Sequence, residues 1–116
     1  MSERALQDAI SATAQLLGRD LRPEVDTGWR IFHPRAARTA NGWRTAGSYD
    51  AQGYPDLTLV RDRVLWVEVK TERGRVRPEQ ELWLEALREA GAEAYVWRES
   101  DWTAGIVEDV LRRQAA

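Results

Sequence analysis

The chain has 116 residues and a mass of 13.3 kDa, which is enough for one hydrophobic core and too little for two domains. It contains no cysteine and a single histidine, so disulfides and zinc sites built from cysteine or from several histidines are excluded, and any bound metal ion must be held by oxygen. The formal net charge of -2 is not that of a typical nucleic-acid-binding protein, so the distribution of charge matters more than its sum.

The first half of the chain predicts a helix, a short strand and a long loop. Ser2 suits the N-cap of a helix that runs to about Leu17 and stops at Gly18. A strand from Trp29 to His33 follows, because apolar and polar residues alternate there. The segment 35–53 is rich in Gly, Ala, Thr, Asn and Ser and is predicted to be a loop, which at this length is usually functional or mobile. The buried stripe of the helix is expected to be Leu6, Ile10, Thr13 and Leu17.

The second half predicts a hairpin and then alternating helices and strands. The hairpin strands are Leu57 to Arg61 and Val64 to Lys70, joined by a tight turn. A helix that starts with Pro78 and ends at Gly91 follows, then a strand from Glu93 to Trp97 and a third helix after Ser100. This order predicts one α/β domain, residues 1–116, with a mixed sheet of about four strands flanked by helices.

Three ionisable residues are predicted to converge at one end of the hairpin. Side chains alternate across a strand, so Glu68 and Lys70 project from the same face. Asp56 begins the partner strand, and the short turn brings it beside the end that carries Glu68 and Lys70. Each has an ordinary structural alternative: Asp56 as a turn residue after proline, and the other two as a cross-strand salt pair.

Oxygen ligands at this point favour a divalent metal ion. The carboxylates of Asp56 and Glu68, with the backbone carbonyl of Val69, are ligands of the kind that Mg²⁺ prefers. Such an ion polarises a phosphoryl oxygen and lowers the pKa of a bound water, while Lys70 stabilises negative charge or orients the attacking hydroxide. The sequence therefore predicts hydrolysis of phosphodiesters with Mg²⁺ or Mn²⁺ as cofactor.

Two basic segments near these residues are candidates for contact with DNA. Between Trp29 and Gly47 no acidic residue occurs, and a second basic run follows Lys70 with only Glu72 inside it. Alone, each run is typical of a solvated loop, but their position favours binding of phosphates. The candidate DNA contacts are His33, Arg35, Arg38, Trp43, Arg44, Arg73, Arg75 and Arg77. Trp66 and Trp83 are expected in the core. A core position is also favoured for Trp29, Trp43, Trp97 and Trp102, with stacking on bases or a dimer contact as alternatives, and Trp43 is the best candidate among them for contact with DNA.

The motifs resemble a known nuclease family. Gly53-Tyr54-Pro55-Asp56 and Val67-Glu68-Val69-Lys70 resemble the PD-(D/E)XK superfamily. The run from Gly53 to Asp101 is similar, more specifically, to the VRR-NUC family, whose stand-alone members occur in phages and bacteria. The residues that carry this likeness are Glu72-Arg73-Gly74, Gln80, Trp83-Leu84, Leu87 and Tyr95-Val96-Trp97-Arg98.

The resemblance implies more than the residues alone do. It implies a restriction-endonuclease-like core and a homodimer that cleaves branched or structured DNA, similar to Holliday-junction resolvases. It maps the family's metal-binding acids onto Asp56 and Glu68, its lysine onto Lys70 and its helical glutamine onto Gln80. It also suggests a metal-linked role for Glu3, for which stabilisation of a helix N-terminus is the alternative. Gln80 can instead be a boundary residue that bonds a nearby backbone group, and His33 can simply face water.

No membrane-spanning segment or signal peptide is predicted. No run approaches the roughly 20 apolar residues that a bilayer requires, and the N-terminus MSERALQDAI is charged where a signal peptide is apolar. We therefore expect a cytoplasmic protein of a bacterium or phage-infected cell, with no membrane partner. Two other functions remain open: a non-catalytic DNA-binding module on the same fold, and an interaction protein that assembles through its aromatic surface.

Overall fold

The computed structural model describes residues 1–18, 28–34, 36–39, 42–45 and 49–115, with backbone alone described for 36–39 and 42–45. The helices and strands of this part of the chain are, in order, α1 (Glu3–Leu16), β1 (Arg30–Phe32), β2 (Ala36–Thr39), β3 (Gly42–Thr45), β4 (Leu57–Val60), β5 (Val64–Val69), α2 (Pro78–Glu89), β6 (Glu93–Trp97), α3 (Glu99–Thr103) and α4 (Ile106–Arg112).

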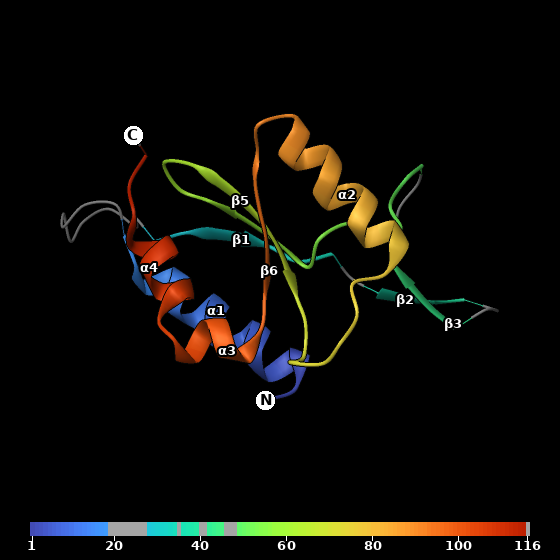
Figure 1. The fold of residues 1–116 in the computed structure, drawn as a ribbon, viewed down its shortest axis with the longest axis horizontal. Helices are drawn as coiled ribbons and strands as arrows, with labels where there is room; N and C mark the ends of the chain where they lie inside the picture. The colour runs from blue at the N-terminus through green and yellow to red at the C-terminus, as the bar shows by residue number, and fades with distance from the viewer. Residues whose placement is uncertain (19–27, 35, 40–41, 46–48, 116) are drawn as a thin grey trace.

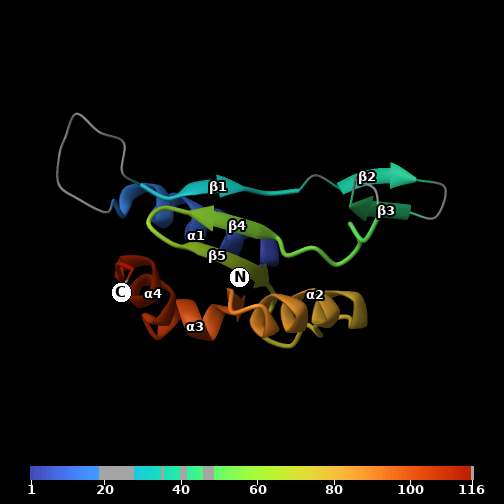
Figure 2. The ribbon, with the colours of Figure 1, turned by 90° about the horizontal axis from the view of Figure 1, so that it is seen from above.

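A four-stranded mixed sheet forms the centre of the molecule. Its strand order is β1-β4-β5-β6, and only the β5–β6 pair is parallel. Figure 1 shows α2 on one side of β6, and α1, α3 and α4 on the other. The view from above shows β1, β4 and β5 side by side (Figure 2). The expected α/β fold, with a mixed sheet of about four strands flanked by helices, is thus confirmed, and it is a restriction-endonuclease-like core.

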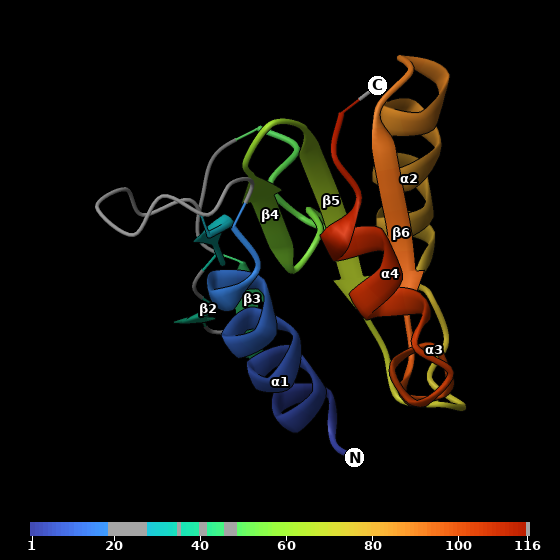
Figure 3. The same cartoon turned by 90° about the vertical axis from the view of Figure 1, so that its left-hand side faces the viewer.

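The core lies between the sheet and the pair α1 and α4. Leu65, Val67 and Val69 of β5 are at most 1% exposed, because this strand is paired on both edges and covered by helices. Figure 3 shows α1 and α4 in front of the sheet and α2 behind β6. The buried cluster also takes in Leu6, Ile10, Ala14, Trp29, Leu57, Leu59, Trp97, Val107, Val110 and Leu111. Strand β5 is therefore a rigid support for whatever its end carries.

Helix α1 begins as predicted, but its buried stripe differs by one residue. The Ser2 hydroxyl accepts a hydrogen bond from the Ala5 backbone N–H at 3.0 Å, which caps the first turn. The buried positions are Leu6, Ile10 and Ala14, so the stripe advances in steps of four residues. Thr13 is only half-buried, and Leu17, which follows the helix, is partly buried against the core.

The segment predicted as one long loop contains a hairpin. Strands β2 and β3 pair antiparallel from Ala36↔Thr45 to Thr39↔Gly42. Sequence reasoning missed this pairing, since the segment carries few of the apolar residues that usually identify strands.

Two of the tryptophans favoured for the core, Trp29 and Trp97, are buried there, whereas the two most firmly expected in it are not. Trp29 and Trp97 are each 2% exposed, whereas Trp66 and Trp83 are only half-buried. The reason is that Trp66 and Trp83 lie at the boundary, where each indole N–H donates a hydrogen bond: Trp66 to the Tyr54 hydroxyl and Trp83 to the Asp50 carbonyl. The expected third helix is also divided in two, because Gly105 adopts a left-handed φ of 80° between α3 and α4.

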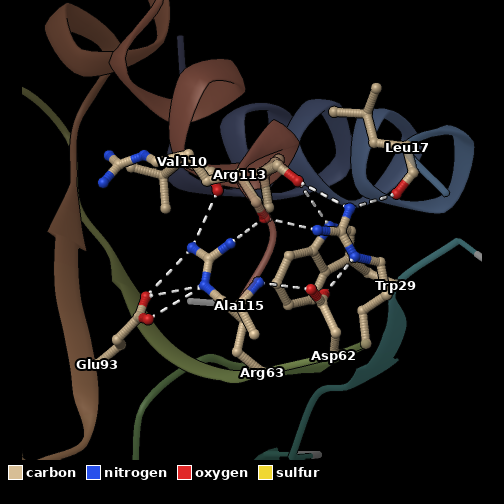
Figure 4. A network of polar contacts seen from close by, with 10 residues as sticks. Leu17, Trp29, Asp62, Arg63, Glu93, Val110, Arg113 and Ala115 are labelled. Atoms are coloured by element: carbon tan, nitrogen blue, oxygen red, sulfur yellow. Dashed lines mark hydrogen bonds and ion pairs between the residues drawn. The ribbon is translucent and has the colours of Figure 1, made fainter. Parts of the chain in front are cut away.

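The turn between β4 and β5 binds the C-terminal ends of two helices (Figure 4). Arg61 donates to the carbonyls of Leu17 at 3.0 Å and Leu111 at 3.1 Å, and its guanidinium lies 4.5 Å from the centre of the Trp29 ring. Arg63 donates to the carbonyls of Val110 and Arg113. The last carbonyls of a helix have no hydrogen-bond donor within the helix, and these two arginines donate to them.

Asp62, between the two arginines, holds the last described residues. Its carboxylate accepts a hydrogen bond from the Ala115 backbone N–H at 2.6 Å and from Arg61 Nε at 2.7 Å. Burial by itself raises the pKa of Asp62, but these hydrogen bonds outweigh it and lower the pKa to about 2. The carboxylate is therefore ionised at neutral pH and keeps the turn attached to the C-terminal segment.

None of the helices in the described ranges is both long enough and apolar enough to cross a membrane.

We expect Arg61→Lys to destabilise the protein by about 2–4 kcal/mol, because lysine cannot donate to several carbonyls at once and Asp62 loses the hydrogen bond from Arg61 Nε. The free energy of unfolding in urea measures this. Arg4→Lys is the matched control, since the Arg4 side chain is 85% exposed and pairs with Asp8 at 3.5 Å on the surface of α1, and it should change stability by less than about 0.5 kcal/mol. Equal effects of the two substitutions would contradict the role given to Arg61.

Candidate active site

Asp56, directly before β4, lies against the end of β5. The register Leu57↔Val67 places the residue before β4 opposite the end of β5. The Asp56 carboxylate accepts a hydrogen bond from the Val69 backbone N–H at 2.8 Å. The N–H and C=O of one strand residue point to the same side, so the Val69 carbonyl faces the edge that Asp56 occupies. The structure thus places Asp56 at the end of β5, as the short turn of the hairpin predicted.

Glu68 and Lys70 are buried side by side at the end of β5. They are 2% and 5% exposed, and the Lys70 Nζ lies 3.9 Å from Glu68 Oε1. Charged side chains are rarely this buried unless they are paired or bind a ligand. The structure therefore places Glu68 and Lys70 on the same face of β5, as the alternation of side chains along a strand predicts.

Gln80 of α2 completes the group. Its Nε2 donates a hydrogen bond to Glu68 Oε1 at 2.9 Å, while its Oε1 accepts one from the Arg77 backbone N–H at 2.9 Å. Both readings of this residue from the sequence therefore describe real contacts, one toward the sheet and one with nearby backbone. The second contact caps the start of α2 and fixes the amide, so that one Glu68 oxygen is held in place.

The carboxyl group of Glu68 has a perturbed electrostatic environment. Burial raises its pKa most, the neighbouring carboxylate of Asp56 raises it further, and Lys70 opposes both, with a resulting pKa of about 9. Glu3, exposed at the start of α1, also raises the pKa of Glu68, by a smaller amount. The charge of Glu3 therefore acts on the site. A carboxyl group whose ionisation is disfavoured by burial and by a second acid is stabilised in its ionised form by a nearby cation.

The donors at this point fit a divalent metal ion. Glu68 Oε2 is buried and has no hydrogen-bond partner among the described residues, although Oε1 has two neighbours. A bare carboxylate oxygen, a second carboxylate and a backbone carbonyl are hard ligands that suit Mg²⁺ or Mn²⁺. In the described part of the chain no three Asp, Glu or His side chains gather as a ready metal site, so water and substrate would have to supply the other ligands.

The loop between Lys70 and α2 is held by two residues that follow β6. Arg98 Nη1 donates to the carbonyls of Thr71 at 2.6 Å, Glu72 at 3.2 Å and Gly74 at 2.8 Å. The Glu72 carboxylate accepts a hydrogen bond from the Ser100 backbone N–H, and hydrogen bonding with the Ser100 side chain, together with this backbone bond, lowers the pKa of Glu72. The parallel pairing of β5 with β6 explains the contact, because the residues that follow both strands emerge at the same end.

Sequence reasoning missed this function of Arg98, although the residue stood in the motif that carried the family resemblance. Its position directly after a strand parallel to β5 was the available signal, but that pairing is a tertiary fact. By connecting Lys70 to α2 through a held loop, Arg98 fixes the spacing between Lys70 and Gln80.

The predicted DNA contacts are distributed over three places. His33 is exposed, and its Nδ1 donates a hydrogen bond to the Asp56 backbone carbonyl at 2.7 Å, so it supports the start of β4 rather than only facing water. Arg73, Arg75 and Arg77 are exposed on the loop beside the site. Arg38, Trp43 and Arg44 belong to β2 and β3, where Arg38 is the backbone partner of Trp43. Arg35 lies outside the described residues.

The family is identified by sequence as well as by this geometry. The family model described as the VRR-NUC domain matches residues 3–101, which is most of the chain and includes the whole site. The chain belongs to the VRR-NUC family. It is therefore a member of the PD-(D/E)XK superfamily and has a nuclease-type fold.

A solved structure described as a VRR_NUC domain protein has the same fold. It is similar to this VRR-NUC protein with a TM-score of 0.62 and 21% sequence identity, over 93% of this chain and 86% of that chain. No curated protein matches the chain.

In this VRR-NUC protein we expect Glu68→Gln to stabilise the metal-free fold by about 1–3 kcal/mol at pH 8, because a neutral amide avoids burying an acid opposite Asp56. Urea unfolding in EDTA measures the effect. Glu85→Gln, on the exposed face of α2, is the control and should change stability by less than about 0.5 kcal/mol. A clear loss of stability in Glu68→Gln would contradict the electrostatic account of the site.

We also expect Arg98→Lys to loosen the loop 71–77, because lysine cannot donate to three carbonyls from one rigid group. Amide hydrogen exchange in this loop should become about tenfold faster, as loss of some local stability predicts. Arg88→Lys is the control, since Arg88 donates to the Ala94 carbonyl at 3.1 Å and does not contact the loop. Unchanged exchange in Arg98→Lys would show that the loop is held by other contacts.

Proposed function

We propose that this VRR-NUC protein is a metal-dependent DNA endonuclease that hydrolyses phosphodiester bonds. The observation that carries the proposal is the buried Glu68 carboxylate, one of whose oxygens lacks a hydrogen-bond partner among the described residues while Asp56 and Lys70 adjoin it. A group of this kind is costly for folding, and costly ionisable groups cluster at functional sites.

The residues that would hold Mg²⁺ or Mn²⁺ are Asp56 and Glu68, with the Val69 carbonyl. When bound, the ion would polarise a phosphoryl oxygen and favour ionisation of a water molecule. Lys70 would neutralise charge that develops on the phosphate or orient the attacking oxygen. Gln80 would position Glu68, because its amide occupies Oε1 and leaves Oε2 for the ion. Glu3 would act on the site through its charge.

The substrate we propose is branched or structured DNA, cleaved in the manner of a Holliday-junction resolvase. Exposed Arg73, Arg75 and Arg77 lie on the loop that follows Lys70, where they would bind phosphates on either side of the cleaved bond. A homodimer would present two active sites related by a two-fold axis, which suits the symmetry of a four-way junction. The reaction would take place in the cytoplasm of a bacterium or phage-infected cell.

Cleavage of a panel of DNA substrates tests the proposal. We expect the wild type to cut at least one of a fork, a flap, a four-way junction and single-stranded DNA with Mg²⁺ or Mn²⁺ and none in EDTA. Lys70→Met keeps a similar volume without the charge and should lower the rate by about 10²–10⁴-fold. Glu85→Gln is the control with an intact site. Absence of cleavage with either metal, or undiminished cleavage by Lys70→Met, would refute the proposal.

Binding experiments separate the competing functions. We expect Mn²⁺ to raise the thermal unfolding temperature of the wild type but not of Glu68→Gln, because a ligand that binds the folded state stabilises it. Metal-independent DNA binding without nicking would indicate a DNA-binding module instead. No DNA binding in a gel shift would favour an interaction protein.

A further inference from the structure

A hollow on α2, next to the candidate active site, has the properties of a base-binding pocket. It has a volume of about 410 Å³, within the range of pockets that take small molecules. Its wall is formed by one face of α2 and by the segment that precedes Gly53. The lining residues are Tyr49, Asp50, Gln52, Glu79, Leu82, Trp83 and Ala86.

The aromatic part of this hollow is held in place before any ligand arrives. The Trp83 indole N–H donates to the Asp50 carbonyl at 2.8 Å, and the ring meets Tyr54 edge-on with 5.0 Å between ring centres. Tyr49 at the rim is fully exposed and has a left-handed φ of 58°, which is unusual for a side chain of this size. Leu82 is 68% exposed beside them. An exposed aromatic and a large exposed apolar residue beside a pre-positioned ring offer a stacking surface.

The charge of the hollow selects against phosphate. Among the described residues of its lining, the charged ones are Asp50 and Glu79, and both are acidic. Carboxylates repel phosphate but accept hydrogen bonds from N–H groups, which nucleobases carry on their edges. An aromatic hollow with acidic groups therefore suits a base, whereas the exposed arginines nearby suit the backbone of the same strand.

The hollow is connected to the catalytic group through the first turn of α2. Glu79, which lines the hollow, directly precedes Gln80, whose side-chain amide donates a hydrogen bond to Glu68. The segment before Asp56 lies close against this turn of α2. A Cβ added to Gly53 would lie 2.4 Å from the Glu79 carbonyl oxygen. Figures 1 and 2 place the N-terminal end of α2 and the β2–β3 hairpin at the same end of the molecule. A nucleotide beside the cleaved phosphate would thus be within reach.

We infer that this hollow binds one unpaired nucleobase of the substrate, stacked on Tyr49 and Trp83 with its N–H groups directed to Asp50 and Glu79. The inference rests on the proposed function, since it adds a base contact to the same DNA substrate. Enzymes that act on branched DNA meet unpaired or unstacked bases at the branch, and such bases cost the least to bind outside a duplex.

The test compares binding to two DNA molecules that differ in one base. A labelled duplex with a short single-stranded arm carries either adenine or an abasic residue at each arm position next to the junction in turn. Fluorescence anisotropy with Ca²⁺ in place of Mg²⁺ measures affinity, and a gel confirms that the DNA stays intact. For the wild type we expect tighter binding of the adenine form at one position, by about fivefold or more.

Matched substitutions isolate the aromatic rings. Trp83→Phe and Trp83→Leu both lose the hydrogen bond to Asp50, but only the leucine variant loses the ring. Tyr49→Phe and Tyr49→Leu form a second pair at an exposed position, where folding is not at risk. We expect the phenylalanine variants to keep the preference for adenine and the leucine variants to lose most of it. Phe32→Leu, an exposed aromatic outside the hollow, should keep it.

The outcomes are distinct from those that test the nuclease. No preference for adenine in the wild type at any position, or an unchanged preference in both leucine variants, overturns the inference. It is also overturned if the leucine variants weaken both DNA forms equally and change the mass in sedimentation, which would make the hollow a contact between two copies. Cleavage is measured separately with Mg²⁺ or Mn²⁺, so a base preference without cleavage would refute the proposed function alone.

Discussion

The buried carboxylate of Glu68 is the constraint on which the rest of the structure depends. It cannot move toward water, because β5 is paired with β4 on one edge and β6 on the other, and the residues between its polar positions are packed in the core. Asp56 is fixed against the same strand by its bond to the Val69 backbone N–H. Two acids are thus held together by backbone pairing, and their mutual repulsion persists until a proton or a cation relieves it.

This arrangement depends on an exact strand register, because a slip of one residue would turn Glu68 and Lys70 into the hydrophobic core. The register is secured at both ends of the hairpin. At one end Arg61 and Arg63 bind helix carbonyls and lie against Trp29, and at the other Asp56 bonds β5 directly. The polar contacts far from the site therefore serve its geometry, since they keep β4 and β5 from sliding past each other.

The site was predictable because its geometry is local. A short turn and the alternation of side chains were sufficient to bring Asp56, Glu68 and Lys70 together, and the four-stranded mixed sheet followed from the order of elements. What failed depends on tertiary contacts. The half-burial of Trp66 and Trp83 depends on the Tyr54 hydroxyl and the Asp50 carbonyl, to which their indole N–H groups donate, and the role of Arg98 requires β6 to lie parallel to β5. None of these neighbours can be inferred from the adjacent sequence, and the β2–β3 hairpin lacked the apolar pattern by which strands are recognised.

The net charge of -2 does not reveal how charge is distributed over the surface, because tertiary contacts decide which charged side chains are available to a ligand. Arg61, Arg63 and Arg98 are committed to backbone carbonyls, so they add to the count of basic residues without offering charge to a ligand. Arg73, Arg75 and Arg77 are exposed on the loop after Lys70, while Asp50 and Glu79 are among the residues that line the hollow on α2. The first turn of α2 therefore follows a loop that carries three exposed arginines, and Glu79 in this turn belongs to the hollow. A nucleic-acid strand has anionic phosphates on one side and N–H-bearing bases on the other, so in the complex that we propose this distribution of charge would orient the strand in a way that net charge cannot express.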